Sequence, residues 1–246
     1  MISRDLGARK WLIRAVLTAT ALFSTAGWAD GPGYTYLGAS YEWTDVKYGV
    51  DPNGDPNFNN GGIEGINLDL SIGLLSWFHL TGQYFTGDCT GCSTFSQNSQ
   101  STNVDLDFEG YKLGIGFNIN LNKKQTTDFV IRGNYIDVDL SSPPNPPFTG
   151  GVTGDGYSIL GQIRSQISEK ADVMVGYEYT QLDYTDPTTG SQSVKNRDML
   201  VGIGYRVWKG LSLNGNAIVF DDDTGFDLGI RWYFGGLWGR DSVVSK

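Results

Sequence analysis

The chain has 246 residues, of which 39% are hydrophobic and only 18% are charged. Its 34 glycines are about twice the share that is usual in a globular protein, which argues against a coiled coil or a helix-rich enzyme. Two cysteines and one histidine leave zinc clusters, disulfide scaffolds and most histidine-based catalysis without the residues they need. The formal net charge of -9 argues against a protein that neutralises the phosphates of nucleic acid, so we expect no nucleic-acid partner.

The first 29 residues have the layout of a secretory signal peptide. Four basic residues precede the uncharged apolar run 15–23, and small residues at 24–29 follow it, so we expect cleavage after Ala29. A membrane anchor is the alternative, but an anchor needs roughly 20 apolar residues and this run is much shorter. Cleavage removes four bases and one acid, which leaves 217 residues with a net charge of -12. We therefore expect an exported, acidic protein.

From residue 34 onward, apolar and polar residues alternate with a period of two. The segment 66–74 is the clearest case, with Ile or Leu at every even position and Asn, Asp, Ser or Gly at every odd position. A strand places these two sets on opposite faces, whereas a helix would scatter both around its circumference. The same rhythm predicts ten strands, with apolar stripes over residues 37–43, 66–74, 78–84, 111–119, 129–135, 157–163, 173–179, 199–207, 211–219 and 226–234.

The connections between the predicted strands alternate in length. Long polar segments follow strands one, three, five and seven, at 44–62, 87–103, 141–153 and 185–194. Short turns follow strands two, four, six and eight, at 76–77, 121–125, 169–171 and 209–210. This alternation predicts an up-and-down meander with both chain ends at the side of the short turns. We expect three parts: a signal peptide at 1–29, a barrel at 30–235 and a short C-terminal tail at 236–246.

Two all-β architectures fit this pattern: a soluble sandwich or barrel, and an antiparallel transmembrane β-barrel. A soluble sheet exposes its polar face to water, where many charges are expected, but here Gly, Ser, Thr, Asn and Gln dominate that face. Tyr and Trp gather at the ends of the apolar stripes, as Tyr41 and Trp43 do at one end and Trp77 and Trp208 at the other. Such bands suit the headgroup level of a bilayer, and only a closed barrel lets strands cross lipid without unpaired backbone groups. The sequence therefore favours an up-and-down transmembrane barrel of ten strands.

Several aromatic and glycine-rich segments resemble those of a known family. They are YTYLGASYEW (34–43), EGYKLGIGF (109–117), DGYS (155–158) and FDLGIRWYF (226–234). Over about residues 34–235 the chain is similar to small outer-membrane β-barrel proteins of Gram-negative bacteria, in particular to the ten-stranded group regulated by diffusible signal factor within the porin-like superfamily. The resemblance implies a bacterial outer-membrane location and supplies no catalytic residues. Members of the family end at or near the final aromatic residue, whereas here residues 235–246 follow Phe234.

The polar faces carry nine charged residues that the predicted barrel turns inward. They are Lys112, Arg132, Arg164, Arg206 and Arg231 against Glu42, Asp69, Glu178 and Asp227. We expect these five bases and four acids to form a nearly neutral network of ion pairs that plugs the lumen, because a ten-stranded barrel is little wider than an eight-stranded one, which side chains fill. Glu178 and Arg206 lie on adjacent predicted strands and are candidates to pair. The alternative is a selectivity path for ions.

The excess of acids falls at the ends of the long connections. The aspartates concerned are Asp45, Asp51, Asp55, Asp88, Asp105, Asp107, Asp137, Asp139, Asp183, Asp186, Asp221, Asp222 and Asp223. A solvated rim is the plain interpretation of this set. A sharper hypothesis is that divalent cations bridge these carboxylates to lipopolysaccharide, which would make the outer-membrane lipids and lipopolysaccharide the partners of the barrel.

Two further motifs resemble metal or redox sites. Cys89 and Cys92 have the spacing of a redox or zinc half-site, but in an exported chain without a second pair we expect a disulfide that pins the loop. The segment 51–62 begins like a calcium loop, yet Pro56 stands where an EF-hand needs glycine and Gly62 where it needs glutamate. We therefore expect no specific metal site and no cofactor.

A catalytic role is disfavoured. Surface hydrolases of the outer membrane act near the long loops, but the only histidine, His79, lies two residues past a short turn. An acid-dependent hydrolase built from rim carboxylates is the remaining enzymatic alternative. We expect instead a structural or surface-interaction role with a largely plugged lumen. The alternatives are a narrow pore for small solutes and an adhesin-like binder that acts through its long loops.

Overall fold

The computed structural model describes residues 34–46, 61–97, 100–123, 126–141, 152–186, 190–219 and 224–234. Within these ranges it contains ten strands: β1 (Tyr36–Val46), β2 (Gly61–Leu75), β3 (Phe78–Gln97), β4 (Gln100–Asn120), β5 (Thr127–Ser141), β6 (Val152–Gln166), β7 (Ala171–Asp186), β8 (Gly190–Trp208), β9 (Leu211–Val219) and β10 (Thr224–Tyr233). None of the described residues belongs to a helix long and apolar enough to cross a membrane. The expected signal peptide at 1–29 and tail at 236–246 lie outside the described residues.

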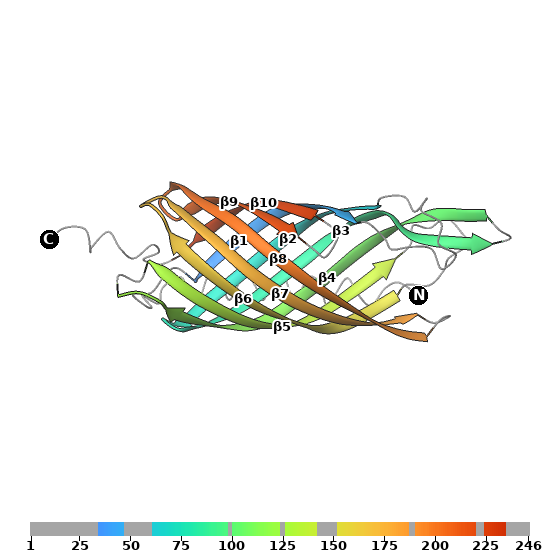
Figure 1. The fold of residues 1–246 in the computed structure, drawn as a ribbon, viewed down its shortest axis with the longest axis horizontal. Coiled ribbons are helices and arrows are strands. Elements are labelled where there is room, and N and C mark those ends of the chain that lie inside the picture. The colour runs from blue at the N-terminus through green and yellow to red at the C-terminus, as the bar shows by residue number, and fades with distance from the viewer. Residues whose placement is uncertain are drawn as a thin grey trace.

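The strands form one closed antiparallel barrel in which each strand pairs with its neighbours in the sequence (Figure 1). β1 closes the ring by pairing with β10, from Tyr36 opposite Tyr233 to Asp45 opposite Thr224. The turns after β2, β4, β6 and β8 lie together at what we call the short-turn end, where β1 begins and β10 ends. We call the opposite end the long-loop end. The predicted ten-stranded up-and-down barrel is confirmed.

The predicted apolar stripes face outward and the alternate residues face the lumen. On β2, Ile66 and Leu68 are 53% and 48% exposed, whereas Asn67 and Ser71 are 6% and 1% exposed. Dissolved in water, such an exterior would present far more contiguous apolar surface than a soluble monomer tolerates. In a bilayer the same surface contacts lipid, so this exterior is that of a membrane barrel.

Aromatic side chains mark both ends of the apolar exterior. Near the long-loop end, the ring centroids of Trp43 and Phe226 lie 6.3 Å apart in a stacked pair. Next to the turn between β2 and β3, Trp77 and Phe117 stack with centroids 6.1 Å apart. Rings of this kind favour the headgroup level of a bilayer, so the two bands delimit the part of the barrel that spans lipid.

Strands β3 and β4 are longer than the alternation predicts. The prediction of a loop at 87–103 is wrong. Both strands extend into this segment, where Ser93 pairs with Val104 and Gln97 pairs with Gln100. This hairpin projects beyond the neighbouring strands at the long-loop end (Figure 1). Beyond the membrane, water lies on both faces of a strand, so backbone pairing persists without an apolar stripe. β7 and β8 extend in the same way through the expected loop at 185–194.

Candidate functional site: the barrel lumen

The nine charged residues expected in the lumen all lie on the inward side of the alternation, and one ion pair among them crosses the lumen. Lys112 on β4 meets Glu178 on β7, with 3.7 Å between Nζ and Oε1. β5 and β6 separate these two strands in the ring, so the pair spans part of the lumen. The two side chains are 28% and 15% exposed, and their contact narrows the lumen at this depth.

Glu178 and Arg206 do not pair, contrary to the sequence-based hypothesis. The register places Glu178 opposite Asp198, and Arg206 lies eight residues further along β8, toward the short-turn end. There the backbone N–H of Arg206 donates to the carbonyl of Lys170 at 2.7 Å, and Asp172 is a charged neighbour of Arg206. The hypothesis was wrong because two residues on adjacent strands meet only if they also lie at the same depth.

Asparagine amides hold two of the expected acids near the long-loop end. The Asn67 side chain donates to Glu42 Oε2 at 2.9 Å, and the Asn216 side chain donates to Asp227 Oδ1 at 2.8 Å. Both asparagines are buried, at 6% and 8% exposed, and each comes from a strand adjacent to its acid. Neutral donors therefore replace part of the ion-pair network that the sequence suggests.

Three further acids face the lumen and are not among the nine predicted residues. Asp128, Asp172 and Asp198 each lie one residue before an apolar stripe, so they share the lumen-facing side of β5, β7 and β8. Extending the alternation to the strand ends would have found them. With these three, the described lumen holds seven acids against five bases, so it has an excess of acid and is not nearly neutral as expected.

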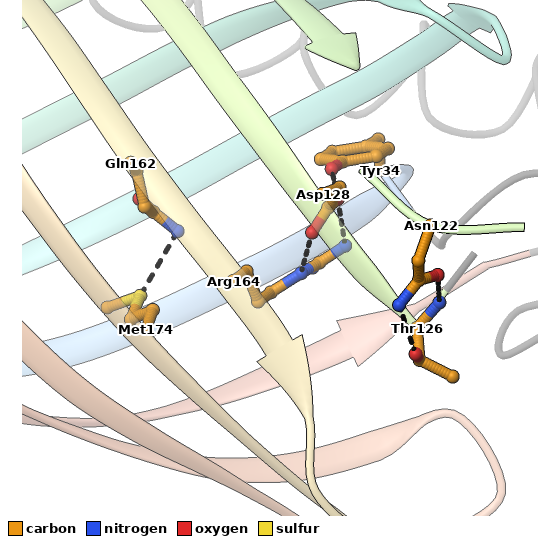
Figure 2. A network of polar contacts seen from close by, with 7 residues as sticks. All are labelled: Tyr34, Asn122, Thr126, Asp128, Gln162, Arg164 and Met174. Carbon is orange, nitrogen blue, oxygen red and sulfur yellow. Dashed lines mark hydrogen bonds and ion pairs between the residues drawn. The ribbon is translucent and has the colours of Figure 1, made fainter. Parts of the chain in front are cut away.

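Tyr34, two residues before β1, lies in a polar network at the short-turn end, which Figure 2 shows. Its hydroxyl donates to Asp128 on β5, and Arg164 on β6 donates to the same carboxylate from Nη2 at 3.1 Å and from Nε at 3.4 Å. The Arg164 guanidinium carbon also lies 4.9 Å from the centre of the Tyr34 ring. In a closed ring of these strands β1 stands opposite β6, so Tyr34 reaches across the opening, which we call the short-turn mouth.

His79 packs beneath this network. Its ring stacks on Tyr34 with centroids 4.9 Å apart and an interplanar angle of 13°. The side chain is 0% exposed, and neither ring nitrogen has a hydrogen-bond partner among the described residues. Gly116 on β4 makes room for it, because a Cβ there would overlap the imidazole. This histidine is therefore far from the long-loop end, where a surface hydrolase would need it.

Outward-facing carboxylates form an acidic belt toward the long-loop end. Its members are Glu64, Asp88, Asp107, Glu109, Asp137, Asp139, Asp155 and Asp183. The register sets Asp155 directly between Asp137 and Asp183 on the neighbouring strands. The Tyr41 hydroxyl donates to Glu64 at 2.7 Å, so the belt directly adjoins the aromatic side chains near the long-loop end. Other rim aspartates, at 51, 55 and 221–223, lie outside the described residues.

No group of three or more His, Cys, Asp and Glu side chains among the described residues is arranged to hold a metal ion. The calcium-like segment is described only from residue 61 onward. Bridging of the acidic belt to lipopolysaccharide by divalent cations stays a prediction.

Cys89 lies on the inward side of β3, is 4% exposed and is disulfide-bonded. The chain has one other cysteine, Cys92, at an irregularity in the pairing of β3 with β4. The Cys92 side chain lies outside the described residues, so the pairing of Cys89 with Cys92 stays a prediction.

Comparison with protein families decides what kind of barrel this is. Residues 15–206 match the model of the outer membrane protein beta-barrel domain. The chain belongs to this family. It is thus an outer-membrane barrel of bacteria, and its short-turn end faces the periplasm. Membership confirms the outer-membrane family and the location that the resemblance implied, while the narrower group regulated by diffusible signal factor stays a prediction.

The chain is similar in fold to solved structures of outer-membrane barrels. The β domain of the Bordetella autotransporter BrkA aligns with a TM-score of 0.51 at 12% identity, covering 82% of this chain and 100% of that chain. OprG from Pseudomonas aeruginosa aligns at 0.46 with 8% identity, covering 83% and 98%. The KdgM porin aligns at 0.43 with 12% identity, covering 81% and 99%. At such identities the likeness concerns the fold alone. No curated protein matches the chain.

Proposed function

We propose that this outer-membrane barrel has a structural or surface-interaction role in the cell envelope and that its lumen is largely plugged at rest. The observation that carries the proposal is a pair of contacts that cross the lumen at different depths. Lys112 meets Glu178 between β4 and β7. At the short-turn mouth, Tyr34 meets Asp128 and Arg164 from the opposite wall. Each contact narrows the passage that a solute would take through the barrel.

The surface available for interaction lies at the long-loop end. The hairpin of β3 and β4 projects there, and the acidic belt runs across the outer surface of β2 to β7 just below it. Exposed segments on a rigid barrel are well placed to contact partners outside the cell. The role we propose is non-enzymatic, and the burial of His79 in the lumen supports this part of the proposal.

Planar-bilayer conductance of the refolded protein tests the plugged lumen. Folded protein is first verified by its mobility on unheated gels. We expect the wild type to give no steady conductance, because both cross-lumen contacts are in place. Steady ionic conductance from the wild type would refute the plugged lumen, and a narrow pore for small solutes would take its place.

The narrow pore is the second candidate function, and one observation favours it. The Lys112 side chain keeps 28% of its surface exposed inside a lumen that is lined with polar residues. If the wild type conducts, the seven acids against five bases predict a preference for cations. The reversal potential in a salt gradient measures that preference. An adhesin-like role is distinguished from both by measuring how whole cells bind a surface after the segments 47–60 and 142–151 are shortened.

A further inference from the structure

The Tyr34 ring is bound at the short-turn mouth in the way that a small ligand would be. Its flat surface contacts the His79 imidazole and the Arg164 guanidinium, each 4.9 Å away measured from the ring centre. Its hydroxyl donates to the Asp128 carboxylate (Figure 2). Only 8% of the Tyr34 surface remains exposed. The ring surface and the hydroxyl of this phenol group therefore each have a contact on the barrel wall.

The three wall residues hold their places without help from Tyr34. Asp128 and Arg164 lie directly opposite each other in the register of β5 and β6, and their side chains form an ion pair at 3.1 Å. His79 is fixed on β3 and packs against Gly116 of β4. We call these three side chains the phenol socket. Ladder pairing and the ion pair, neither of which involves Tyr34, set the shape of the socket.

Tyr34 itself is no part of the strand ladder, while the adjacent Thr35 is held by the Phe234 N–H on its carbonyl and by the Gly73 N–H on its hydroxyl. Tyr34 lies two residues outside β1, whose first ladder pairs are those of Tyr36 with Ser71 and with Tyr233. Its departure would uncover the buried His79 ring, whose two nitrogens have no hydrogen-bond partner among the described residues. A buried imidazole whose nitrogens have no such partner is an exception that calls for an explanation, and a site that binds an aromatic ring supplies one.

We propose that the phenol socket, His79, Asp128 and Arg164, is a binding site for a hydroxylated aromatic ring, which Tyr34 fills as a tethered ligand and thereby closes the short-turn mouth. This inference rests on the proposed plugged lumen and deepens it. The ligand class follows from the three contacts: a flat ring for the imidazole and guanidinium, and a hydroxyl donor for the carboxylate. A carboxylated ring would meet Asp128 with like charge, and a plain hydrocarbon ring would leave that carboxylate without its donor.

The wild type should resist free ligand because Tyr34 competes from the same chain. A group tethered by a short segment acts at an effective concentration on the order of millimolar, so a free phenol must exceed that level to displace it. Removal of the Tyr34 ring should therefore expose the site. The probe is therefore p-cresol, the side chain of tyrosine without its backbone.

The experiment compares Tyr34→Ala with Tyr36→Ala in the full refolded chain. Tyr36 also faces the lumen near the short-turn end and lies under a guanidinium, that of Arg231 at 5.1 Å, but it is not part of the socket. Binding of p-cresol is measured by calorimetry in detergent, with toluene as the ring that lacks a hydroxyl. We expect saturable p-cresol binding to Tyr34→Ala only, and about tenfold weaker binding of toluene or none. In bilayers, Tyr34→Ala should conduct more often than Tyr36→Ala, and p-cresol should block the difference.

The outcomes separate this inference from the proposed function. If Tyr34→Ala binds p-cresol no better than Tyr36→Ala does, or binds toluene equally well, the socket is not a phenol site, whatever the wild type conducts. Steady conductance of the wild type would instead refute the plugged lumen while leaving the binding result to stand alone. If Tyr34→Ala does not refold by itself, refolding is repeated with p-cresol. Rescue by p-cresol and not by toluene supports the socket, and no rescue overturns it.

Discussion

Lys112 Nζ lies 3.7 Å from Glu178 Oε1, although two strands of the barrel wall stand between the strands that carry these residues. Long side chains from β4 and β7 must therefore extend toward each other through the lumen. A wide, water-filled channel would leave each of them hydrated at its own wall. The contact therefore narrows the lumen at this depth, and it can be tested by mutation.

Loss of either member of this pair should destabilise the barrel. We expect Lys112→Ala and Glu178→Ala each to lower the free energy of unfolding by about 1 to 3 kcal/mol, between the values for exposed and buried pairs. Urea unfolding in detergent, followed by mobility on unheated gels, measures the change. The double variant should cost less than the sum of the singles.

Arg206 provides the matched control for this comparison of single and double variants. It belongs to the same lumen but lies at another depth, so Glu178→Ala and Arg206→Ala should be additive. Coupling between Glu178 and Arg206 as strong as that between Glu178 and Lys112 would contradict the register described for β7 and β8.

Charge on the lipid face should cost more than charge in the lumen. Leu70 on β2 faces outward near the middle of the apolar stripe, and Gln83 faces the lumen opposite Asp69. We expect Leu70→Arg to destabilise the barrel by about 2 to 4 kcal/mol, as charges at the bilayer midplane do. Gln83→Arg should cost less because Asp69 is beside it. Unfolding in lipid bilayers measures both, and equal effects would refute the inside and outside assignment.

Neutralising the centre of the acidic belt should stabilise the protein. Asp155 lies directly opposite Asp137 on one side and Asp183 on the other, and like charges in such positions repel. We expect Asp155→Asn to raise the free energy of unfolding by about 0.2 to 1 kcal/mol at low ionic strength, and the gain to vanish in high salt.

The same variant tests the predicted bridging by divalent cations. If magnesium holds these carboxylates to lipopolysaccharide, then adding magnesium should stabilise the wild type more than Asp155→Asn in vesicles that contain lipopolysaccharide. An equal response of the two proteins would leave the belt as a solvated surface.

Cys89 and Cys92 should be joined to each other. Alkylation of the unfolded, non-reduced protein is expected to label neither cysteine, and labelling after reduction should reach both. On the chain-entropy model, so short a loop contributes at most about 2 kcal/mol, so Cys92→Ser should lower stability only modestly. Labelling of both thiols without reduction would reopen the possibility of a metal half-site.

The sequence by itself determined the strand number, the order of the strands and the face that each strand turns to lipid. These features are local: Ile66 and Asn67 point in opposite directions because successive residues of a strand do, wherever the strand lies. The alternation does not determine where strands end beyond the membrane, because backbone pairing carries the hairpin of β3 and β4 past the end of its apolar stripe. Its polar residues therefore resemble those of a loop.

Only the tertiary structure decided which lumen residues meet. Ring closure and the register between strands set the depth of every inward side chain, and neither can be read from a single strand. That is why Glu178 pairs with Lys112 across the lumen instead of with Arg206 on the next strand. Likewise Tyr34 precedes the first apolar stripe and has no pattern of its own, yet closure brings the opposite wall, with Asp128 and Arg164, within reach of its hydroxyl and ring.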